Sequence, residues 1–298
     1  MKQAILMDSQ ILNDLESCPT KLELHHNQKL VPIIKATALE KGDLFHRALS
    51  LWRKLQVHRA KWNFEKRENL CVKLMQKLIV KMNTSLDELE PEIEYFKFYV
   101  EVKYRSDDQF LTISVEKPFI KQIYECDDFV LFWTGQPDWI FVDVNGLFHP
   151  SRKGQIYVLD TKTGSRDMEP HKLSNQFIGY CYGLEGEELI VDKVNFYVKL
   201  DPEKSFKRRI VTIDHWLKER WYGKVVKRAH EYFKYVQSGI DELTDTNYTS
   251  CDKYSGCMFR EICETVPKEN ETVLEARQFI KDRDFKKGIW DISRILST

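Results

Sequence analysis

Two aspartates and a lysine have the residue types and spacing of a metal-dependent hydrolytic site. Pro137-Asp138 is followed 22 residues later by Asp160-Thr161-Lys162, and both aspartates lie at the ends of apolar segments that we predict to be strands. Because side chains alternate along a strand, Asp160 and Lys162 are expected on the same face. Two carboxylates can hold a hard divalent cation, and a neighbouring lysine could position or deprotonate a water and stabilise charge on a phosphate.

The acid-x-lysine pattern is weak evidence when taken alone. It also occurs as Glu101-Val102-Lys103 and Asp284-Phe285-Lys286, and a surface salt bridge would explain any one of these triplets. Only the triplet at Asp160 follows an apolar strand and has a second strand-end aspartate upstream. The surrounding motifs therefore have to decide between a salt bridge and a site.

Two helical pairs supply that context. Gly42 and His46 are four residues apart, as are Gln176 and Tyr180, so each pair lies on one face of a predicted helix. In chain order the motifs are Gly-x-x-x-His, Gly-x-Pro-Asp, Asp-x-Lys and Gln-x-x-x-Tyr. This series resembles the RecB-like branch of the PD-(D/E)xK nuclease superfamily.

The resemblance implies a role for each matching residue. The metal site, for one or two Mg²⁺ or Mn²⁺ ions, would consist of His46, Asp138, Asp160 and the backbone carbonyl of Thr161. Lys162 would assist the attacking water. Gln176 and Tyr180 would orient the site and the substrate.

The cysteines extend the resemblance. Cys251, Cys257 and Cys263 are separated by five residues each, and Cys18 lies far upstream in Leu-Glu-Ser-Cys-Pro-Thr-Lys. These segments look like the iron–sulfur nucleases of the AddB type and the CRISPR-associated exonucleases. The resemblance implies that the four cysteines ligate a 4Fe–4S cluster, for which four thiolates are the usual ligand set.

One departure concerns the fourth ligand. The commoner spacing would place a cysteine at Tyr254, whereas this chain has Cys251 three residues earlier. A structural zinc is the alternative occupant, although its usual ligand spacing is two to four residues. The remaining cysteines, Cys71, Cys126 and Cys181, lie in apolar or amphipathic segments and are predicted to be core residues.

Hydrophobic periodicity predicts the elements that position these residues. Helices are expected at 9–17, 36–55, 64–81, 173–184 and 216–236, with a break near 89–92 and a turn-rich tail from 240 that ends in a packed helix around Trp290. Strands are expected at 96–102, 111–115, 129–133, 139–142, 156–159, 194–198 and 209–213. This order predicts a single α/β domain. By resemblance it would be restriction-endonuclease-like, a central mixed sheet flanked by helices, with the N- and C-terminal segments clasped by the cysteine-ligated cluster.

We expect one nuclease domain over residues 1–298. Its parts would be a helical N-terminal part (9–90), a catalytic sheet core (91–200), a helical and cysteine-bearing part (201–263) and a tail (264–298).

Composition excludes several classes of protein. A chain with 46 basic and 46 acidic residues, 42% hydrophobic and 12% aromatic, is not largely disordered. With no long apolar run and no phosphate-binding loop, we expect neither a membrane protein nor an ATP motor. An odd number of cysteines, seven, and no export signal indicate a cytoplasmic protein.

Charge is segregated along the chain. Residues 51–81 carry nine Lys and Arg against two Glu, and residues 201–234 carry ten against five acids. These segments either line a groove that follows a phosphate backbone or are solvated helix faces. Some interleaved aromatic residues could stack on unpaired bases, although each one is more simply explained as core. They are Trp52, Trp62, Trp216, Trp221 and Tyr222.

These features predict a metal-dependent DNA exonuclease that prefers single strands and free ends. Two alternatives stay open, a non-catalytic nucleic-acid-binding or adaptor protein that keeps the fold and cluster, and an endonuclease. A separate helicase or recombination partner is conceivable because the chain has no motor motif.

Overall fold

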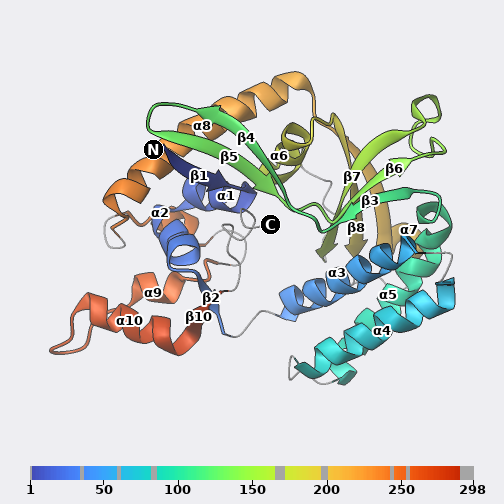
Figure 1. The fold of residues 1–298 in the computed structure, drawn as a ribbon. Coiled ribbons are helices and arrows are strands. Elements are labelled where there is room, and N and C mark those ends of the chain that lie inside the picture. Colours follow the sequence, from blue (N-terminus) through green and yellow to red (C-terminus); the bar gives the residue numbers. More distant parts are fainter. Residues whose placement is uncertain are drawn as a thin grey trace.

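The computed structural model describes residues 2–33, 37–58, 62–81, 86–164, 172–195, 201–241, 245–252 and 256–288. These residues form a mixed α/β fold whose sheets are flanked by helices (Figure 1). The described strands form a five-stranded sheet, a three-stranded sheet and a two-stranded sheet. The prediction of one central sheet was therefore wrong in its details.

The five-stranded sheet has the order β3-β6-β7-β8-β9. Strands β7 and β8 run parallel, and the other neighbours are antiparallel. The strands are β3 (Leu111–Val115), β6 (Trp139–Asp143), β7 (Gln155–Gly164), β8 (Glu188–Asn195) and β9 (Phe206–Thr212). Only Val194 and Asn195 of the predicted 194–198 strand are described, and they end β8; residues 196–198 lie outside the described residues.

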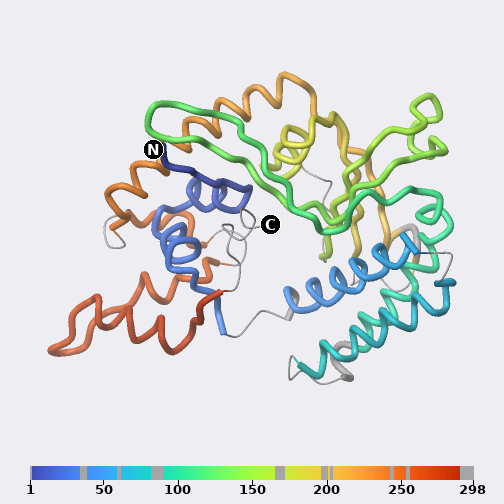
Figure 2. The backbone as a smooth tube through the Cα atoms, viewed as in Figure 1, coloured from blue at the N-terminus to red at the C-terminus, as the bar shows by residue number. Residues whose placement is uncertain are grey.

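Three long helices form the helical part next to this sheet (Figure 2). They are α3 (Thr37–Gln56), α4 (Phe64–Lys81) and α5 (Leu86–Asp107), and they share a core that includes Phe45, Trp52 and Phe96. The predicted helix at 64–81 is confirmed, and the one at 36–55 is confirmed nearly to its ends. The predicted strand at 96–102 is wrong, because these residues belong to α5, and Pro91 lies inside that helix instead of breaking the chain.

The three-stranded sheet has the order β1-β5-β4, with β1 (Gln3–Met7) parallel to β5 (Phe129–Gly135) and β4 (Phe119–Glu125) antiparallel to it. Helices α1 (Ser9–Ser17), α6 (Asn175–Gly183) and α8 (His215–Ser238) contribute to the same apolar core. Strands β1 and β4 were not predicted. Their absence from the prediction explains why one sheet was expected where the described residues form two larger ones.

Segments from the first and last parts of the described chain meet in a small third core. Strand β2 (Leu30–Pro32) pairs with β10 (Phe285–Lys287), and α9 (Arg260–Glu264) and α10 (Val273–Asp284) share this core with the π-helix η1 (Glu23–Asn27), which follows α2 (Pro19–Leu22). Phe259 lies at the centre of this core, stacked on Phe285. Short 3-10 turns η2 (Pro150–Arg152) and η3 (Tyr248–Ser250) and helix α7 (Pro202–Ser205) complete the elements.

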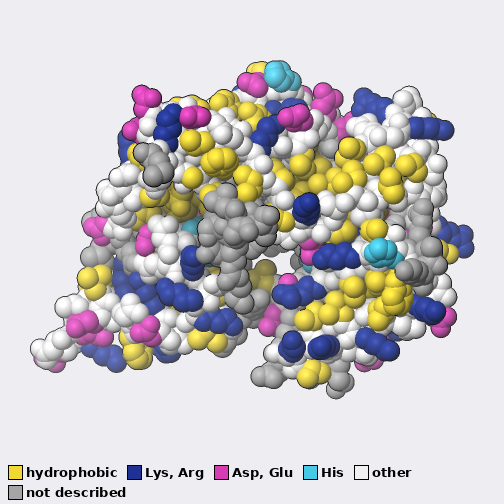
Figure 3. Space-filling model, viewed as in Figure 1, with side chains coloured by type: hydrophobic (Ala, Val, Ile, Leu, Met, Phe, Trp, Pro, Cys, Tyr) yellow, Lys and Arg dark blue, Asp and Glu magenta, His cyan; other side chains and the backbone are white. Residues whose placement is uncertain are grey.

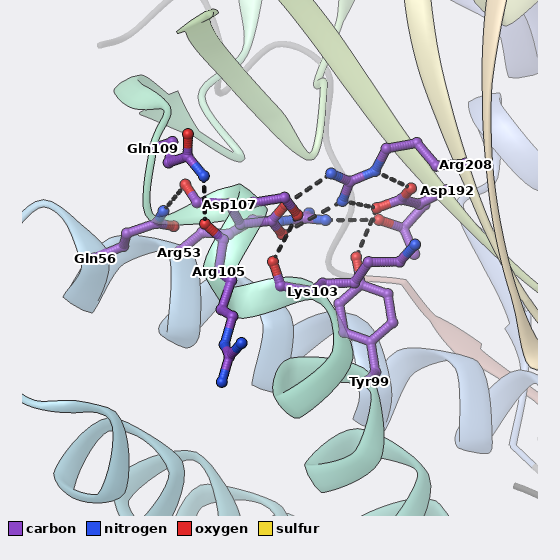
Figure 4. Close-up of polar contacts among 11 residues, drawn as sticks. Arg53, Gln56, Tyr99, Lys103, Arg105, Asp107, Gln109, Asp192 and Arg208 are labelled. Carbon is purple, nitrogen blue, oxygen red and sulfur yellow. Dashed lines mark hydrogen bonds and ion pairs between the residues drawn. The ribbon is translucent and has the colours of Figure 1, made fainter. Parts of the chain in front are cut away.

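A buried ionic network joins α5 to the five-stranded sheet (Figure 4). Arg208 on β9 lies 2.6 Å from Asp192 Oδ1 and 2.7 Å from Asp107 Oδ1, and the Tyr99 hydroxyl donates to Asp192 at 2.6 Å. Asp192 and Asp107 are both buried. Each charge has an opposite charge beside it, which is the arrangement that makes buried ions tolerable.

Two further predictions concern the tail and the membrane. Helix α10 was not foreseen, and the terminal helix expected around Trp290 lies outside the described residues. Within the part of the chain that the structure describes, no helix is both long and apolar enough to cross a membrane.

Candidate active site

Adjacent strands bring the two predicted carboxylates together. Asp138 immediately precedes β6, and Trp139 pairs with Leu159 on β7, so Asp138 lies beside Asp160. Asp160 is buried, and Lys162 Nζ lies 2.8 Å from its Oδ2. The expectation that Asp160 and Lys162 share one face of a strand is confirmed.

Helix α3 carries His46 to the same place. Its Nδ1 lies 3.4 Å from Asp138 Oδ2, and the backbone N–H of Thr161 donates to that oxygen at 2.6 Å. The close approach depends on Gly42, because a Cβ at that position would lie 2.9 Å from Thr163 Oγ1. The Gly-x-x-x-His spacing thus has a physical reason: the glycine lets the helix touch β7, and one turn later the histidine reaches Asp138.

Helix α6 supplies Gln176 and Tyr180. The Gln176 amide accepts from Lys162 Nζ at 2.6 Å and donates to Asp160 Oδ1 at 3.1 Å. It also donates to the Tyr180 hydroxyl at 3.0 Å, and that hydroxyl donates to the carbonyl oxygen of Gln136 at 2.9 Å. The Gln-x-x-x-Tyr pair therefore holds both members of the Asp160–Lys162 pair in place.

Burial and neighbouring charges shift the pKa values of the two carboxylates in opposite directions. Burial raises the pKa of Asp160, against the lowering effect of Lys162. Burial also opposes ionisation of Asp138, but the hydrogen bond and charge of His46, with Arg53, bring its pKa below the ordinary value. Asp138 in turn outweighs burial at His46 and raises the pKa of the imidazole. Divergent pKa values of neighbouring acids are typical of functional sites.

Two residues in this region were missed by the sequence analysis. Arg53 lies seven residues after His46, hence on the same face of α3, and its guanidinium donates to Thr161 Oγ1 at 3.0 Å. Asn175 begins α6, is buried, and donates to Asn13 Oδ1 at 2.6 Å. Helical spacing could have indicated Arg53, whereas nothing in the sequence marks the partner of Asn175.

The four predicted cluster cysteines also converge. Burial, together with the nearby thiols of Cys18, Cys257 and Cys251 and against the lowering effect of Arg277, raises the pKa of the Cys263 thiol to about 11. The backbone N–H of Asn247 donates to Cys18 Sγ at 3.3 Å, and that of Cys257 to the carbonyl of Cys251 at 2.8 Å. Thiols from both ends of the chain are therefore close enough to interact, although residue 254 lies outside the described residues.

Of the three cysteines that we predicted to be core residues, two are buried and one is partly buried. Cys71 and Cys181 are buried in two different apolar cores, and burial raises the pKa of each thiol to about 12. Cys126 is partly buried against the core of the three-stranded sheet.

The aromatic residues of the basic segments are mostly structural. Trp52 and Trp221 are buried, and Tyr222 packs partly buried and stacked on Tyr182. Trp216 is 64% exposed, with the Arg220 guanidinium over its ring, and Trp62 is half-buried. Among these aromatic residues, only Trp216 and Trp62 are accessible enough to stack on unpaired bases.

The helices of the two basic segments lie far apart, but the segments themselves meet in part. Residues 64–81 form α4, and residues 215–234 belong to α8, at opposite sides of the molecule (Figure 1). The second segment also contains β9, and Phe206 of this strand packs in the same core as Trp52 and Met75 of the first segment. Figure 3 shows Lys and Arg side chains over α3 and over the region of α10, on either side of a hollow near the middle of this face.

The fold and this constellation define a protein of the nuclease type, and comparison identifies the family. The model of the PD-(D/E)XK nuclease superfamily matches residues 10–264, and the chain belongs to this superfamily. No curated protein matches the sequence.

Three solved structures resemble the chain at low identity. A crystal structure of SSO0001 is 14% identical, with a TM-score of 0.34, and the match covers 78% of this chain and 98% of that one. The alkaline exonuclease LHK-Exo from Laribacter hongkongensis is 11% identical, with a TM-score of 0.32, covering 66% and 94%. Its complex with dAMP is 10% identical with the same score and coverage.

Proposed function

We propose that this protein is a divalent-metal-dependent deoxyribonuclease that degrades DNA from free ends and prefers single strands. The observation that carries the proposal is the convergence of His46, Asp138, Asp160 and Lys162 on the neighbouring strands β6 and β7, in the interior of the five-stranded sheet. Membership of the nuclease superfamily supports phosphodiester hydrolysis as the reaction.

The residues present suit a hard divalent cation. Asp160 Oδ2 is a buried oxygen without a hydrogen bond of good geometry, and the Lys162 ammonium lies 2.8 Å from it. A buried, under-satisfied carboxylate oxygen beside a second carboxylate is a natural ligand for Mg²⁺ or Mn²⁺. The proposed ligands are His46, Asp138, Asp160 and the carbonyl of Thr161. When bound, the ion would lower the pKa of a bound water and neutralise charge on the phosphate.

The protein groups would orient the reaction. Lys162 is held by Gln176 at 2.6 Å, so its ammonium has a defined position from which to assist a water or stabilise an oxyanion. Arg53, through Thr161 Oγ1, and Tyr180, through the carbonyl of Gln136, fix the two strand segments that carry the aspartates. The site is therefore organised before substrate binds.

The four thiols support the further proposal of a 4Fe–4S cluster on Cys18, Cys251, Cys257 and Cys263. Cys251, Cys257 and Cys263 are separated by five residues each, whereas the usual spacing of zinc ligands is two to four residues. The sequence spacing therefore favours the cluster over zinc. A cluster there would join the first helices to the C-terminal segment.

The decisive experiment compares linear and circular single-stranded DNA of one sequence, both internally labelled, with Mg²⁺ or Mn²⁺ and an EDTA control. We expect metal-dependent release of nucleotides from the linear form and none from the circular form. Equal rates on both forms would show endonuclease action. Binding to DNA without any cleavage would favour the non-catalytic alternative.

A linear double-stranded substrate of the same sequence tests strand preference. We expect slower cleavage than for the single strand, and cleavage of both should fall steeply with salt because phosphate contacts release counterions.

A further inference from the structure

A second cluster of metal-ligating side chains lies away from the candidate active site. Asp14 on α1 is buried, and its Oδ2 lies 2.8 Å from His25 Nδ1 and 3.0 Å from His26 Nε2. Lys21 Nζ lies 2.6 Å from the other oxygen, Oδ1. Two imidazoles thus converge on a single carboxylate oxygen while a lysine occupies its partner.

The local fold explains how two consecutive histidines reach one atom. His25 and His26 lie in η1, a five-residue π-helix, and their ring centroids are 4.5 Å apart. Neighbouring residues in an α-helix point about 100° apart, since it has 3.6 residues per turn, and the wider π turn brings them closer in direction. Isolated π turns recur at functional sites.

The three donor atoms have the separation that one cation requires. All three lie within 4.8 Å of one another, and they form the only such group of three or more His, Cys, Asp or Glu side chains among the described residues. Ligands about 2.0–2.2 Å from a tetrahedral ion are roughly 3.3–3.6 Å apart. The two carboxylate-to-imidazole distances, 2.8 and 3.0 Å, are those of hydrogen bonds, so an ion would replace these bonds with a movement of less than about 1 Å.

The surroundings provide access and an outer shell. Asp14 and Lys21 border a cavity of about 610 Å³ that Ser250 and Cys257 also line. An ion could reach the carboxylate of Asp14 from this cavity. Lys21 pairs with Oδ1 and leaves Oδ2 for an ion. A metal-binding carboxylate is commonly oriented in this way by a group that does not itself touch the metal.

We propose that Asp14, His25 and His26 bind one divalent transition-metal ion of the Zn²⁺ type, distinct from the catalytic metal. Two imidazoles and a carboxylate suit such an ion better than Mg²⁺. The ion would link α1, which carries Asp14, to η1, which carries the histidines. Cys18 lies between these two elements in the chain, so the link would also restrain this cysteine. The inference does not depend on the nuclease proposal.

Cobalt(II) is the probe, because its absorption distinguishes nitrogen and oxygen ligands from thiolates. The full chain, purified anaerobically, is titrated with Co²⁺ in excess Mg²⁺, which competes for the candidate active site. In the difference spectrum against the same protein without Co²⁺, which removes the absorption of an iron–sulfur cluster, we expect one tightly bound equivalent with weak visible bands and no thiolate-to-cobalt charge-transfer band. His25→Gln and His26→Gln should each weaken this binding at least about 10-fold.

Two matched variants locate the ion. His58→Gln removes an exposed histidine and should leave binding unchanged, and His46→Gln, at the candidate active site, should also leave it unchanged. Thermal unfolding gives a second readout, since Co²⁺ should raise the Tm of the wild type but not of His26→Gln. Full binding by both η1 variants, loss of the signal in His46→Gln, or a thiolate band would each overturn the proposal.

Discussion

Asp160 and Lys162 lie on one face of β7, and Lys162 Nζ is 2.8 Å from Asp160 Oδ2 although the aspartate side chain is 3% exposed and the lysine side chain 45%. The pair therefore spans the boundary between the core and the solvent. Gln176 contacts both members, accepting from the lysine and donating to the aspartate. The lysine can face a substrate in solvent while the carboxylate stays in a low-dielectric setting, where electrostatic effects are strong.

The first prediction concerns Asp160. Asp160→Asn keeps the size of the side chain and removes the charge that would hold the metal, so kcat on linear single-stranded DNA with Mg²⁺ should fall by about 10²–10³-fold or more. Asp128→Asn, an exposed residue in the turn between β4 and β5, is the control and should retain full activity. Near wild-type cleavage by purified Asp160→Asn would falsify the assigned site.

The second prediction concerns Asn175, which we expect to act by positioning α6. Its amide donates to Asn13 Oδ1 at 2.6 Å and accepts from Lys224 Nζ at 2.8 Å, and the next residue is Gln176. Loss of this anchor should misplace Gln176 and with it Lys162, because small displacements of catalytic groups are costly.

The measurement for Asn175→Ala is a separate determination of kcat and KM. We expect kcat about 10-fold lower with KM for DNA nearly unchanged, and iron content as in the wild type. Asn145→Ala, at an exposed position, is the control. If kcat is unchanged, or if KM alone moves, Asn175 does not position the site.

Much of the candidate site could be predicted from the motifs, because the relative positions of these residues follow from the local geometry of a strand or a helix. Strand alternation relates Asp160 to Lys162, and one helical turn relates Gln176 to Tyr180; both relations hold in the structure. The helical spacing of Arg53 from His46 was available in the sequence, but its contact with Thr161 joins residues far apart, as does the contact of Asn175 with Asn13.

The fold shows where periodicity misleads. Residues 96–102 alternate as a strand would, with Phe96, Phe98 and Val100, yet they belong to α5. In that helix Phe96 and Val100 are four residues apart on the buried face, and Val102 is exposed. Packing against α3 and α4, rather than local pattern, decides the conformation.

The third prediction tests the thiol ligands. Anaerobically purified protein should be brown and contain about four iron atoms per chain, as a 4Fe–4S cluster requires. Cys251→Ser and Cys257→Ser should lose the iron and lower the Tm, because the link between the chain ends is lost. Cys126 is a partly buried cysteine outside the proposed cluster, so the control variant Cys126→Ser should keep its iron.

Tyr254→Phe completes this series. If Cys251 supplies the fourth ligand, the tyrosine variant keeps its iron. Full iron retention in Cys251→Ser would place the fourth ligand elsewhere, and zinc without iron in the wild type would contradict the cluster.

The last prediction concerns the buried network of Asp192, Arg208 and Asp107. Removing one partner of a buried ion pair leaves a desolvated charge, so Asp192→Asn should lower the free energy of unfolding by about 3–5 kcal/mol at pH 7. The control is Glu185→Gln, whose 81% exposed side chain pairs with Lys121 and should contribute less than about 1 kcal/mol.

The same network predicts a response to acid with a defined sign. Burial opposes ionisation of Asp192, but Arg208 outweighs it and lowers the pKa of this carboxyl below the ordinary 3.8. A carboxyl with a lowered pKa in the folded state stabilises the fold above its unfolded-state pKa, and this stability is lost as pH falls through the folded-state value. The unfolding free energy from urea denaturation should therefore decrease below about pH 4, and less steeply in Asp192→Asn than in the wild type. Identical slopes for the two proteins between pH 4 and the acid unfolding transition would mean that folding does not lower the pKa of Asp192, and would contradict its pairing with Arg208.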